Sequence, residues 1–456
     1  MRGLVLGAAC RVAGTRGLAH AAFLGALLVG DTATAQWQPA AGTTALNMQA
    51  LLSRGAFCFA GGATGAYRST DGAASFAFSN TGNNAVGPTR GFASDASYVY
   101  TCTSQGVFRS ADNGATWVAK SSGLTNLLSS GILQTQSNLF MVGPVGVFRS
   151  SNQGDSWVAA GLAGIDVRCI TAIGGTLFVG TNSSGIYKST NLGATWVAAN
   201  NGLTSTTFRA IEAKGNTLFA GGQIGTGVFR SLDQGASWTL LGGGLPVNSY
   251  RGFASDNSLV VAGAFGAGVF YSVDNGDHWT SINVGLGNLE IFDLEIHQGH
   301  LVVATNTQGV FRFPISKLPF LEFGTGCPGA GGTPELHASQ GSVPRLGSTL
   351  QLTLQNLPAS AAAAMGALGL SSSTWGGVPL PADLGTLGMP GCTQFVSVDV
   401  ATFLPAGAGT APWSIPVPAQ SALVGTTVFL QALALDATAN AFGAVVTNAA
   451  SATVIG

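Results

Sequence analysis

Four arginines lie at matching places in a chain that is otherwise poor in charge, since only 8% of its 456 residues are charged. Arg209 and Arg251 each follow a tryptophan by 13 residues, and Arg90 and Arg168 follow an aromatic residue by 14 and 11. Guanidinium groups gathered at one point bind carboxylates and sulfates through charge-assisted hydrogen bonds. The arginines therefore predict an anion site if the fold brings them together. The alternative is that each arginine ties its own loop to neighbouring carbonyls.

Acidic side chains at similar phases of the chain raise the possibility of glycoside hydrolysis. That reaction needs a pair of carboxyl groups at a defined separation. The nearest acids are Glu212, Asp256, Asp293 and Glu295, but nothing in their spacing identifies a general acid and its partner. The five histidines are scattered and there is no Cys-x-x-Cys pair. The sequence therefore assigns no catalytic residue and predicts neither a metal site nor a cofactor.

A motif of the form Ser-x-Asp-x-Gly-x-x-Trp recurs through the first two thirds of the chain. Its serines are separated by steps of 41, 40, 39, 42 and 41 residues, at Ser69, Ser110, Ser150, Ser189, Ser231 and Ser272. A seventh partial copy lies at 309–313. A period of about 40 residues indicates a propeller or a solenoid, so the repeated elements must position the arginines.

The motif resembles the Asp-box, or bacterial neuraminidase repeat, which occurs in sialidases, xyloglucan-cleaving glycosidases, sortilin-type receptors and photosystem II assembly factors. The resemblance implies that each copy forms the hairpin turn between the third and fourth strands of a propeller blade. A side-chain oxygen at the Asp position would accept backbone N–H groups in the turn, and asparagine would serve as well. We expect this structural role for Asp71, Asp112, Asn152, Asn191, Asp233 and Asp274.

The positions of the aromatic residues predict how the ring closes. Trp37 lies 32 residues before Ser69, much as Trp117 lies 33 before Ser150. The segment around Trp37 should therefore supply the outer strand of a last blade whose three inner strands cover about residues 291–313. We expect an all-β fold with a seven-bladed propeller over residues 36–318, in which the innermost strands line a channel and the four arginines lie where those strands begin.

The period is lost after residue 318. Residues 322–456 contain four runs typical of strands, 348–357, 394–403, 426–435 and 444–455, which predict a smaller antiparallel β-sandwich. The stretches around Cys327 and Cys392 resemble a C-terminal module of exported bacterial proteins, and that module supplies no activity. The two cysteines share this region and are candidates for a disulfide. Cys58, Cys102 and Cys169 occupy different phases of the repeat, and we interpret them as core residues.

Residues 1–35 are typical of a secretory signal peptide, with three arginines, an apolar run over 21–30 and Ala33-Thr34-Ala35 before Gln36. The apolar run is shorter than the 18 or more residues of a spanning helix, which disfavours an uncleaved anchor. A lipid anchor on Cys10 is disfavoured because the apolar run follows that cysteine. No basic stripe suggests nucleic-acid binding.

We expect a secreted, extracellular, cell-surface or periplasmic protein that is monomeric in its mature form. The steps of 39–42 residues leave little room for the long insertions that usually build active sites on propellers. We therefore expect a non-catalytic binding protein whose partner is a glycan or a protein, such as an anionic polysaccharide. The alternative is a glycoside hydrolase of sialidase-like or xyloglucanase-like type. Residues 311–314, Phe-Arg-Phe-Pro, mimic a sialidase signature but lie at the wrong end of the repeats.

Overall fold

The structure, a computed structural model, describes residues 37–81, 88–223, 225–257, 259–339, 342–359, 361 and 363–455. The signal peptide expected over residues 1–35 lies outside them. The chain divides into two compact units, Ala35–Ser316 and Lys317–Gly456. No helix in the described ranges combines the length and apolar character that a bilayer-crossing segment needs.

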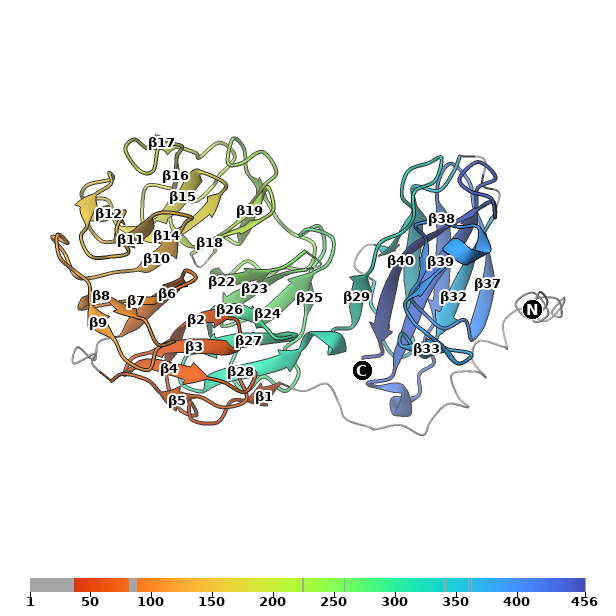
Figure 1. Cartoon of the computed structure of the whole chain (residues 1–456), viewed down its shortest axis with the longest axis horizontal. Coiled ribbons are helices and arrows are strands. Elements are labelled where there is room, and N and C mark those ends of the chain that lie inside the picture. The colour runs from red at the N-terminus through yellow and green to blue at the C-terminus, as the bar shows by residue number, and fades with distance from the viewer. Residues whose placement is uncertain are drawn as a thin grey trace. The chain divides into compact units, whose positions relative to one another are not determined.

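The described part of the first unit contains seven four-stranded antiparallel sheets (Figure 1). Their innermost strands are β2 (Met48–Arg54), β6 (Thr89–Ser94), β10 (Gly131–Gln134), β14 (Val167–Ile173), β18 (Phe208–Lys214), β22 (Ser249–Ser255) and β26 (Ile291–His297). The second strands are β3 (Phe57–Gly62), β7 (Val99–Thr103), β11 (Leu139–Gly143), β15 (Thr176–Thr181), β19 (Thr217–Gly222), β23 (Val260–Phe265) and β27 (His300–Thr305).

The third strands are β4 (Gly65–Ser69), β8 (Gly106–Ser110), β12 (Gly146–Ser150), β16 (Ile186–Ser189), β20 (Val228–Ser231), β24 (Gly268–Ser272) and β28 (Gly309–Pro314). The outermost strands are only two residues long, which leaves little edge for unwanted pairing. They are β5 (Ala77–Phe78), β9 (Val118–Ala119), β13 (Val158–Ala159), β17 (Val197–Ala198), β21 (Thr239–Leu240), β25 (Thr280–Ser281) and β1 (Gln38–Pro39).

The seven sheets form a closed ring. Each innermost strand contacts the innermost strand of the next sheet, and β26 contacts β2. In the last sheet, β1 comes from the start of the described chain and pairs with β28, with Gln38 opposite Arg312 and Pro39 opposite Phe311. The spacing of Trp37 predicted this pairing of the two ends of the ring.

A shared tryptophan contact ties neighbouring sheets together. The indole N–H of Trp117 donates to the carbonyl of Ser79, which follows the outermost strand of the preceding sheet, at 2.8 Å. Trp157, Trp196 and Trp238 make the equivalent bonds to the sheets before theirs. Trp37 donates in the same way to Ile282, just after β25. Trp37 thus occupies the tryptophan position of the sheet that closes the ring.

Arginines on the third strands form a second set of ties between sheets. A terminal guanidinium nitrogen of Arg109 donates to the carbonyl of Gln153, in the turn of the next sheet, at 2.8 Å. The corresponding arginine of the last sheet, Arg312, reaches the carbonyl of Gly72 in the first. These arginines hold neighbouring sheets together. They are not among the four arginines that the sequence indicates as a candidate anion site.

The turn after each third strand carries the repeated motif, and its side chains hold the turn. The hydroxyl of Ser110 donates to Asp112 and accepts from the backbone N–H of Gly114, at 2.7 Å each. Asp112 Oδ1 also accepts the N–H of Thr116 at 2.8 Å. In the next turn, the amide oxygen Oδ1 of Asn152 takes the place of the Asp112 carboxylate oxygen and accepts the N–H of Ser156 at 2.9 Å. The side chain at this position therefore acts as an acceptor, whether or not it is charged.

The second unit contains a five-stranded sheet in the order β29-β40-β39-β32-β37 and a three-stranded sheet in the order β30-β31-β38. A Cβ on Gly366 of β32 would come within 2.8 Å of the buried Trp413 ring on β38, so the two sheets pack closely there. Their strands are β29 (Phe320–Phe323), β30 (Glu335–Ala338), β31 (Thr349–Gln355), β32 (Ala363–Gly369), β37 (Val400–Pro405), β38 (Ala411–Pro416), β39 (Thr427–Leu435) and β40 (Ala444–Thr453).

Shorter elements complete the description of both units. They are the 3-10 helices η1 (Ile315–Lys317), η3 (Gly385–Leu387) and η4 (Ser421–Leu423) and the two-residue strands β33 (Thr374–Trp375), β34 (Val378–Pro379), β35 (Ala382–Asp383) and β36 (Thr393–Gln394). The pair β33-β34 and the pair β35-β36 each form a separate small sheet.

The strand prediction for this unit was incomplete. Three predicted runs correspond to β31, β39 and β40, but the run 394–403 is broken between β36 and β37, where Ser397 turns the chain through bonds to Ser371 and Asp399. The missed strand β32 is rich in alanine and glycine, which have low strand propensity. The missed β38 contains two prolines, which fit there because it is an edge strand.

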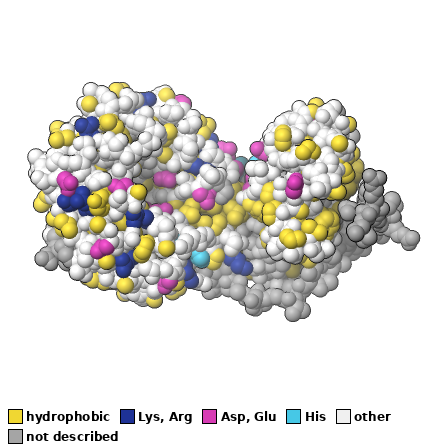
Figure 2. All heavy atoms as spheres, in the orientation of Figure 1, with side chains coloured by type: hydrophobic (Ala, Val, Ile, Leu, Met, Phe, Trp, Pro, Cys, Tyr) yellow, Lys and Arg dark blue, Asp and Glu magenta, His cyan; other side chains and the backbone are white. Residues whose placement is uncertain are grey.

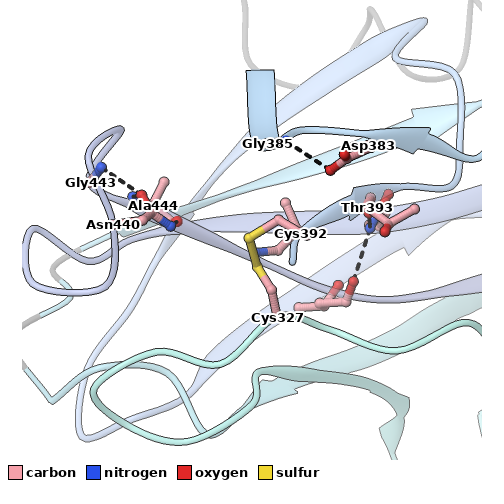
Figure 3. Close-up of a disulfide and its surroundings, with 11 residues drawn as sticks. Cys327, Asp383, Gly385, Cys392, Thr393, Asn440, Gly443 and Ala444 are labelled. Carbon is pink, nitrogen blue, oxygen red and sulfur yellow. Dashed lines mark hydrogen bonds between the residues drawn. A yellow bond between two sulfur atoms is a disulfide. The ribbon is translucent and has the colours of Figure 1, made fainter. Parts of the chain in front are cut away.

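The cysteines of this unit, Cys327 and Cys392, are joined in a disulfide that is buried (Figure 3). The bond links the segment before β30 to the segment before β36, 65 residues apart in sequence. Cys58, Cys102 and Cys169 are free thiols in the first unit, and only Cys169 is partly exposed.

Candidate functional site

A cavity of about 620 Å³ lies at the centre of the ring. Every one of the seven innermost strands contributes residues to its wall, and Arg90, Arg168, Arg209 and Arg251 are among them. Ligand pockets in proteins commonly have volumes of about 300–1,000 Å³. The fold therefore brings the four selected arginines to one cavity large enough for a small molecule or the end of a chain.

The same irregularity of the backbone positions these side chains. In six of the innermost strands the pairing with the second strand skips one residue, which forms a β-bulge. A bulge leaves the extra residue without a partner in the ladder and changes the direction of its side chain. The skipped residues are Gln49, Arg90, Arg168, Arg209, Arg251 and Phe292. All six line the cavity.

Arg251 lies in an aromatic corner beside the cavity. Its guanidinium carbon is 3.8 Å from the centroid of the Phe265 ring and 5.0 Å from that of Phe292. Such stacking fixes the plane of a guanidinium group and removes water from its faces. Its Nε is buried without a hydrogen-bond partner in the described structure. Burial, followed by the charge of Arg209, lowers the pKa of Arg251.

Arg209 and Arg168 complete an arc of three arginines on adjacent sheets. Burial lowers the pKa of Arg209, and the charge of Arg168 acts in the same direction. Arg168 is paired with Asp166 through one terminal nitrogen, but its Nε is buried and unpartnered in the described structure. The three positive charges repel one another, so an anion bound among them would reduce this electrostatic repulsion. Arg90, on β6, is exposed at the same cavity.

Carboxyl groups share the cavity wall with the arginines. Glu212 of β18 and Asp293 and Glu295 of β26 line it. The fourth acid considered from the sequence, Asp256, lies outside this lining. The backbone N–H groups of Leu51 and Leu294 donate to Asp293, at 2.8 and 2.9 Å, and the hydroxyl of Ser255 donates to Glu212 at 2.9 Å.

Burial sets the protonation of these carboxyl groups. It raises the pKa of Glu212 and of Asp293 to about 7 each. Burial and the negative charges of Asp293 and Glu212 raise the pKa of Glu295 to about 8. Perturbed carboxyl groups of this kind are frequent at functional sites, although structural networks also produce them. The described ranges contain no group of three or more His, Cys, Asp or Glu side chains that could hold a metal ion.

Sequence reasoning missed the neutral members of the wall. Gln49 and Phe292 occupy the bulge position without being arginines. Phe265, which lies outside the cavity lining, belongs to a second strand and stacks on Arg251. An alignment of the innermost strands in phase would have found the first two, because each precedes a small or acidic residue and then an aliphatic one. The bulge itself leaves no signal in residue type. Figure 2 shows that charged side chains are sparse on the visible surface of the molecule.

Comparison with known proteins gives the fold and nothing finer. No family model and no curated protein matches the chain. YCF48 from Cyanidioschyzon merolae matches with a TM-score of 0.51 at 12% identity, over 62% of this chain and 100% of that one. A structure of YCF48 bound to D1 peptide matches with a TM-score of 0.50 at 13% identity, over 61% and 96%.

The extracellular domain of a putative hybrid two-component system from B. thetaiotaomicron is also similar. It matches with a TM-score of 0.52 at 14% identity, over 93% of this chain and 59% of that one. These neighbours are β-propeller proteins, and the closed ring of four-stranded sheets is accordingly a β-propeller.

Proposed function

We propose that this protein is a secreted, non-catalytic binding protein and that its central cavity holds an anionic ligand. In this proposal the seven sheets are the blades of an Asp-box propeller, and the second unit is a β-sandwich module. Export rests on the character of residues 1–35, and a glycan or a protein segment outside the cell would supply the anion.

The observation that carries the proposal is the arc of Arg168, Arg209 and Arg251 on one cavity. Within the described structure, the side chains of Arg209 and Arg251 donate no hydrogen bond, and two of the three arginines have a buried Nε without a partner. Arginine side chains that only held loops would donate to nearby carbonyls, as Arg109 and Arg312 do on the third strands. The cavity arginines therefore retain donors that no other described group uses, and all three residues line one cavity.

Acidic polysaccharides are our first choice of ligand class. Uronic acids and sulfate esters present anions that match arginine donors, and the end of a saccharide chain fits a cavity of about 620 Å³. An acidic peptide has matching charges, so the binding screen should include both.

A screen of purified protein against glycans and acidic peptides tests the proposal. We expect binding that weakens as salt is added. Arg209→Ala and Arg251→Ala should each weaken it by about 1.5–3 kcal/mol, the range for hydrogen bonds to charged groups. Arg149→Ala removes a charge from β12, outside the cavity wall, and serves as the control. Equal losses in all three variants, or no salt-sensitive binding, would contradict the proposal.

The second candidate function is glycoside hydrolysis. The observation that favours it is the presence of Glu212, Asp293 and Glu295 on the same cavity, with pKa values suited to a general acid. Against it, Asp293 already accepts two backbone N–H groups. A sialidase and endo-glucanase assay distinguishes the two functions. Release of sialic acid or reducing sugar that Glu212→Gln or Asp293→Asn abolishes would make the protein an enzyme.

A further inference from the structure

The propeller cavity contains two sets of ionisable side chains on the same strands. The cavity arginines occupy the bulge position, and Glu212 follows Arg209 on β18 by three residues. Asp293 and Glu295 stand one and three residues after Phe292, the bulge residue of β26. Glu212 and Glu295 therefore occupy the same position on two strands. All three carboxyl groups line the cavity that the arginines line.

The carboxyl groups interact with one another across this wall. The charge of Glu212 acts on Asp293, and both act on Glu295. Desolvation of all three favours their neutral forms. When they ionise, up to three negative charges stand in the cavity whose arginines would otherwise be available to a ligand. The nearest acids acting on Arg209 and Arg251 are Asp166 and Glu290, and ionised carboxylates elsewhere on the same wall would lower the positive potential of the cavity further.

Glu212, Asp293 and Glu295 are the acidic side chains that line the cavity, and other ionisable groups lie near them. Burial raises the pKa of the Cys169 thiol to about 12 and raises that of Cys58 further, so both stay neutral. Burial lowers the pKa of His297, which keeps it neutral too. Lys214, later on β18, interacts with Asp256 and Asp274. On β2, Arg54 donates to the carbonyls of Asp95 and Ala96.

We propose that anion binding in this cavity is coupled to protonation of Glu212, Asp293 and Glu295, so that the site binds most tightly when these carboxyl groups are neutral. The inference rests on the proposed function and adds a regulation of the same site. Affinity is greatest below about pH 6.5 and falls as the pH rises through 7 to 8, because each proton lost places a negative charge in the cavity. A ligand would be held in a mildly acidic environment and released in an alkaline one.

Inorganic sulfate is a suitable probe, because its charge is constant over the whole range. We expect its dissociation constant, measured by calorimetry at low ionic strength, to be about tenfold larger at pH 8.5 than at pH 6. Calorimetry in buffers with different ionisation enthalpies should also show net proton uptake on binding at pH 7.5. The second measurement needs no variant, so it tests the coupling even if a substitution prevents folding.

Variants locate the coupling. Glu212→Gln keeps an acceptor for Ser255 and should reduce the ratio of affinities between pH 6 and 8.5, and adding Glu295→Gln should reduce it further. Asp155→Asn removes a carboxylate from an exposed ion pair outside the cavity and should leave the ratio unchanged.

Sulfate binding with constant affinity and no proton uptake would overturn the coupling and leave the anion site intact. An affinity ratio that Asp155→Asn changes as much as Glu212→Gln would also overturn it. Absence of sulfate, glycan and acidic-peptide binding at every pH would overturn the anion site itself, and the coupling with it.

Discussion

The outer turns and the cavity wall belong to the same seven sheets, but they use repetition differently. In the turns, both the backbone and the side chains repeat, and the serine of each motif bonds to the Asp or Asn two residues later. On the wall, the backbone repeats as a bulge in six strands while the residue there is glutamine, arginine or phenylalanine.

The difference separates structural residues from candidate binding residues. If a bulge required an arginine, Gln49 and Phe292 could not occupy the same position. The bulge is therefore a property of the backbone, and its side chain is free to serve another purpose. We infer that substitutions in the turns will cost stability and that substitutions of the cavity arginines will cost binding.

Loss of a turn tryptophan should have the largest effect. Trp117 is 1% exposed and bonds to the preceding sheet through Ser79. Trp117→Ala should lower the free energy of unfolding by about 3–5 kcal/mol, the range for truncating a large buried aromatic residue. Chemical denaturation measures this change. A loss below 1 kcal/mol would show that the tie between sheets contributes little to stability. The outer turns would then be no more structural than the cavity wall.

The carboxyl groups of the cavity wall should produce the next effect, a dependence of stability on pH. The pKa values of Asp293 and Glu295 are raised above those of an unfolded chain, to about 7 and about 8. The folded state therefore binds protons more tightly between about pH 4 and 8. Their contribution to stability is fully present below about pH 4 and is lost as the pH rises through 7 to 8.

Melting temperatures between pH 5 and 9 measure this dependence. We expect the propeller to melt at a lower temperature at pH 9 than at pH 5.5, and Glu295→Gln to reduce the difference. Hydrogen bonds from Ser75 and Ser237 lower the pKa of the turn residues Asp71 and Asp233 to about 2. These two residues therefore become protonated, and reduce stability, only in stronger acid. A melting temperature that rises toward pH 9 would contradict the assignment of buried, neutral acids to the wall.

A change within one turn should have a smaller effect. Asp112→Ala removes the acceptor for Ser110 and for the N–H and hydroxyl of Thr116, and should cost about 1–2 kcal/mol. Asp112→Asn should cost much less, because Asn152 makes the equivalent contacts in its own turn. Denaturant midpoints of the two variants measure the difference. Equal losses would mean that charge, which two of the six turns lack, is what the position requires.

How much the sequence could predict follows the same division. The glycine, the side-chain acceptor and the tryptophan of the motif each indicate a part of the turn geometry. The repeat, its period and the pairing of the two ends of the ring could therefore be predicted. Positions of the arginines could be counted from those turns. The bulges could not be predicted, because they depend on how two strands align and not on residue type. In the second unit, β32 and β38 have weak strand propensity and become strands through pairing with β39 and β31.

The smallest expected effect is also the one with an unusual sign. Arg209 is partly buried, donates no hydrogen bond in the described structure and is destabilised by Arg168. Arg209→Met keeps the apolar stem while removing the charge, so the free energy of unfolding should stay within about 0.5 kcal/mol or rise by up to about 1 kcal/mol. The same variant should weaken salt-sensitive anion binding, as expected for Arg209→Ala. Chemical denaturation and a binding titration measure the two effects, with Arg109→Met as the matched control.

Arg109 donates to Gln153 and pairs with Asp155, so that control should lose stability and keep binding. If Arg209→Met instead costs more than about 1 kcal/mol, the cavity arginine is part of the scaffold after all. The outer turns and the cavity wall would then differ only in which residue types they use, and both would be structural.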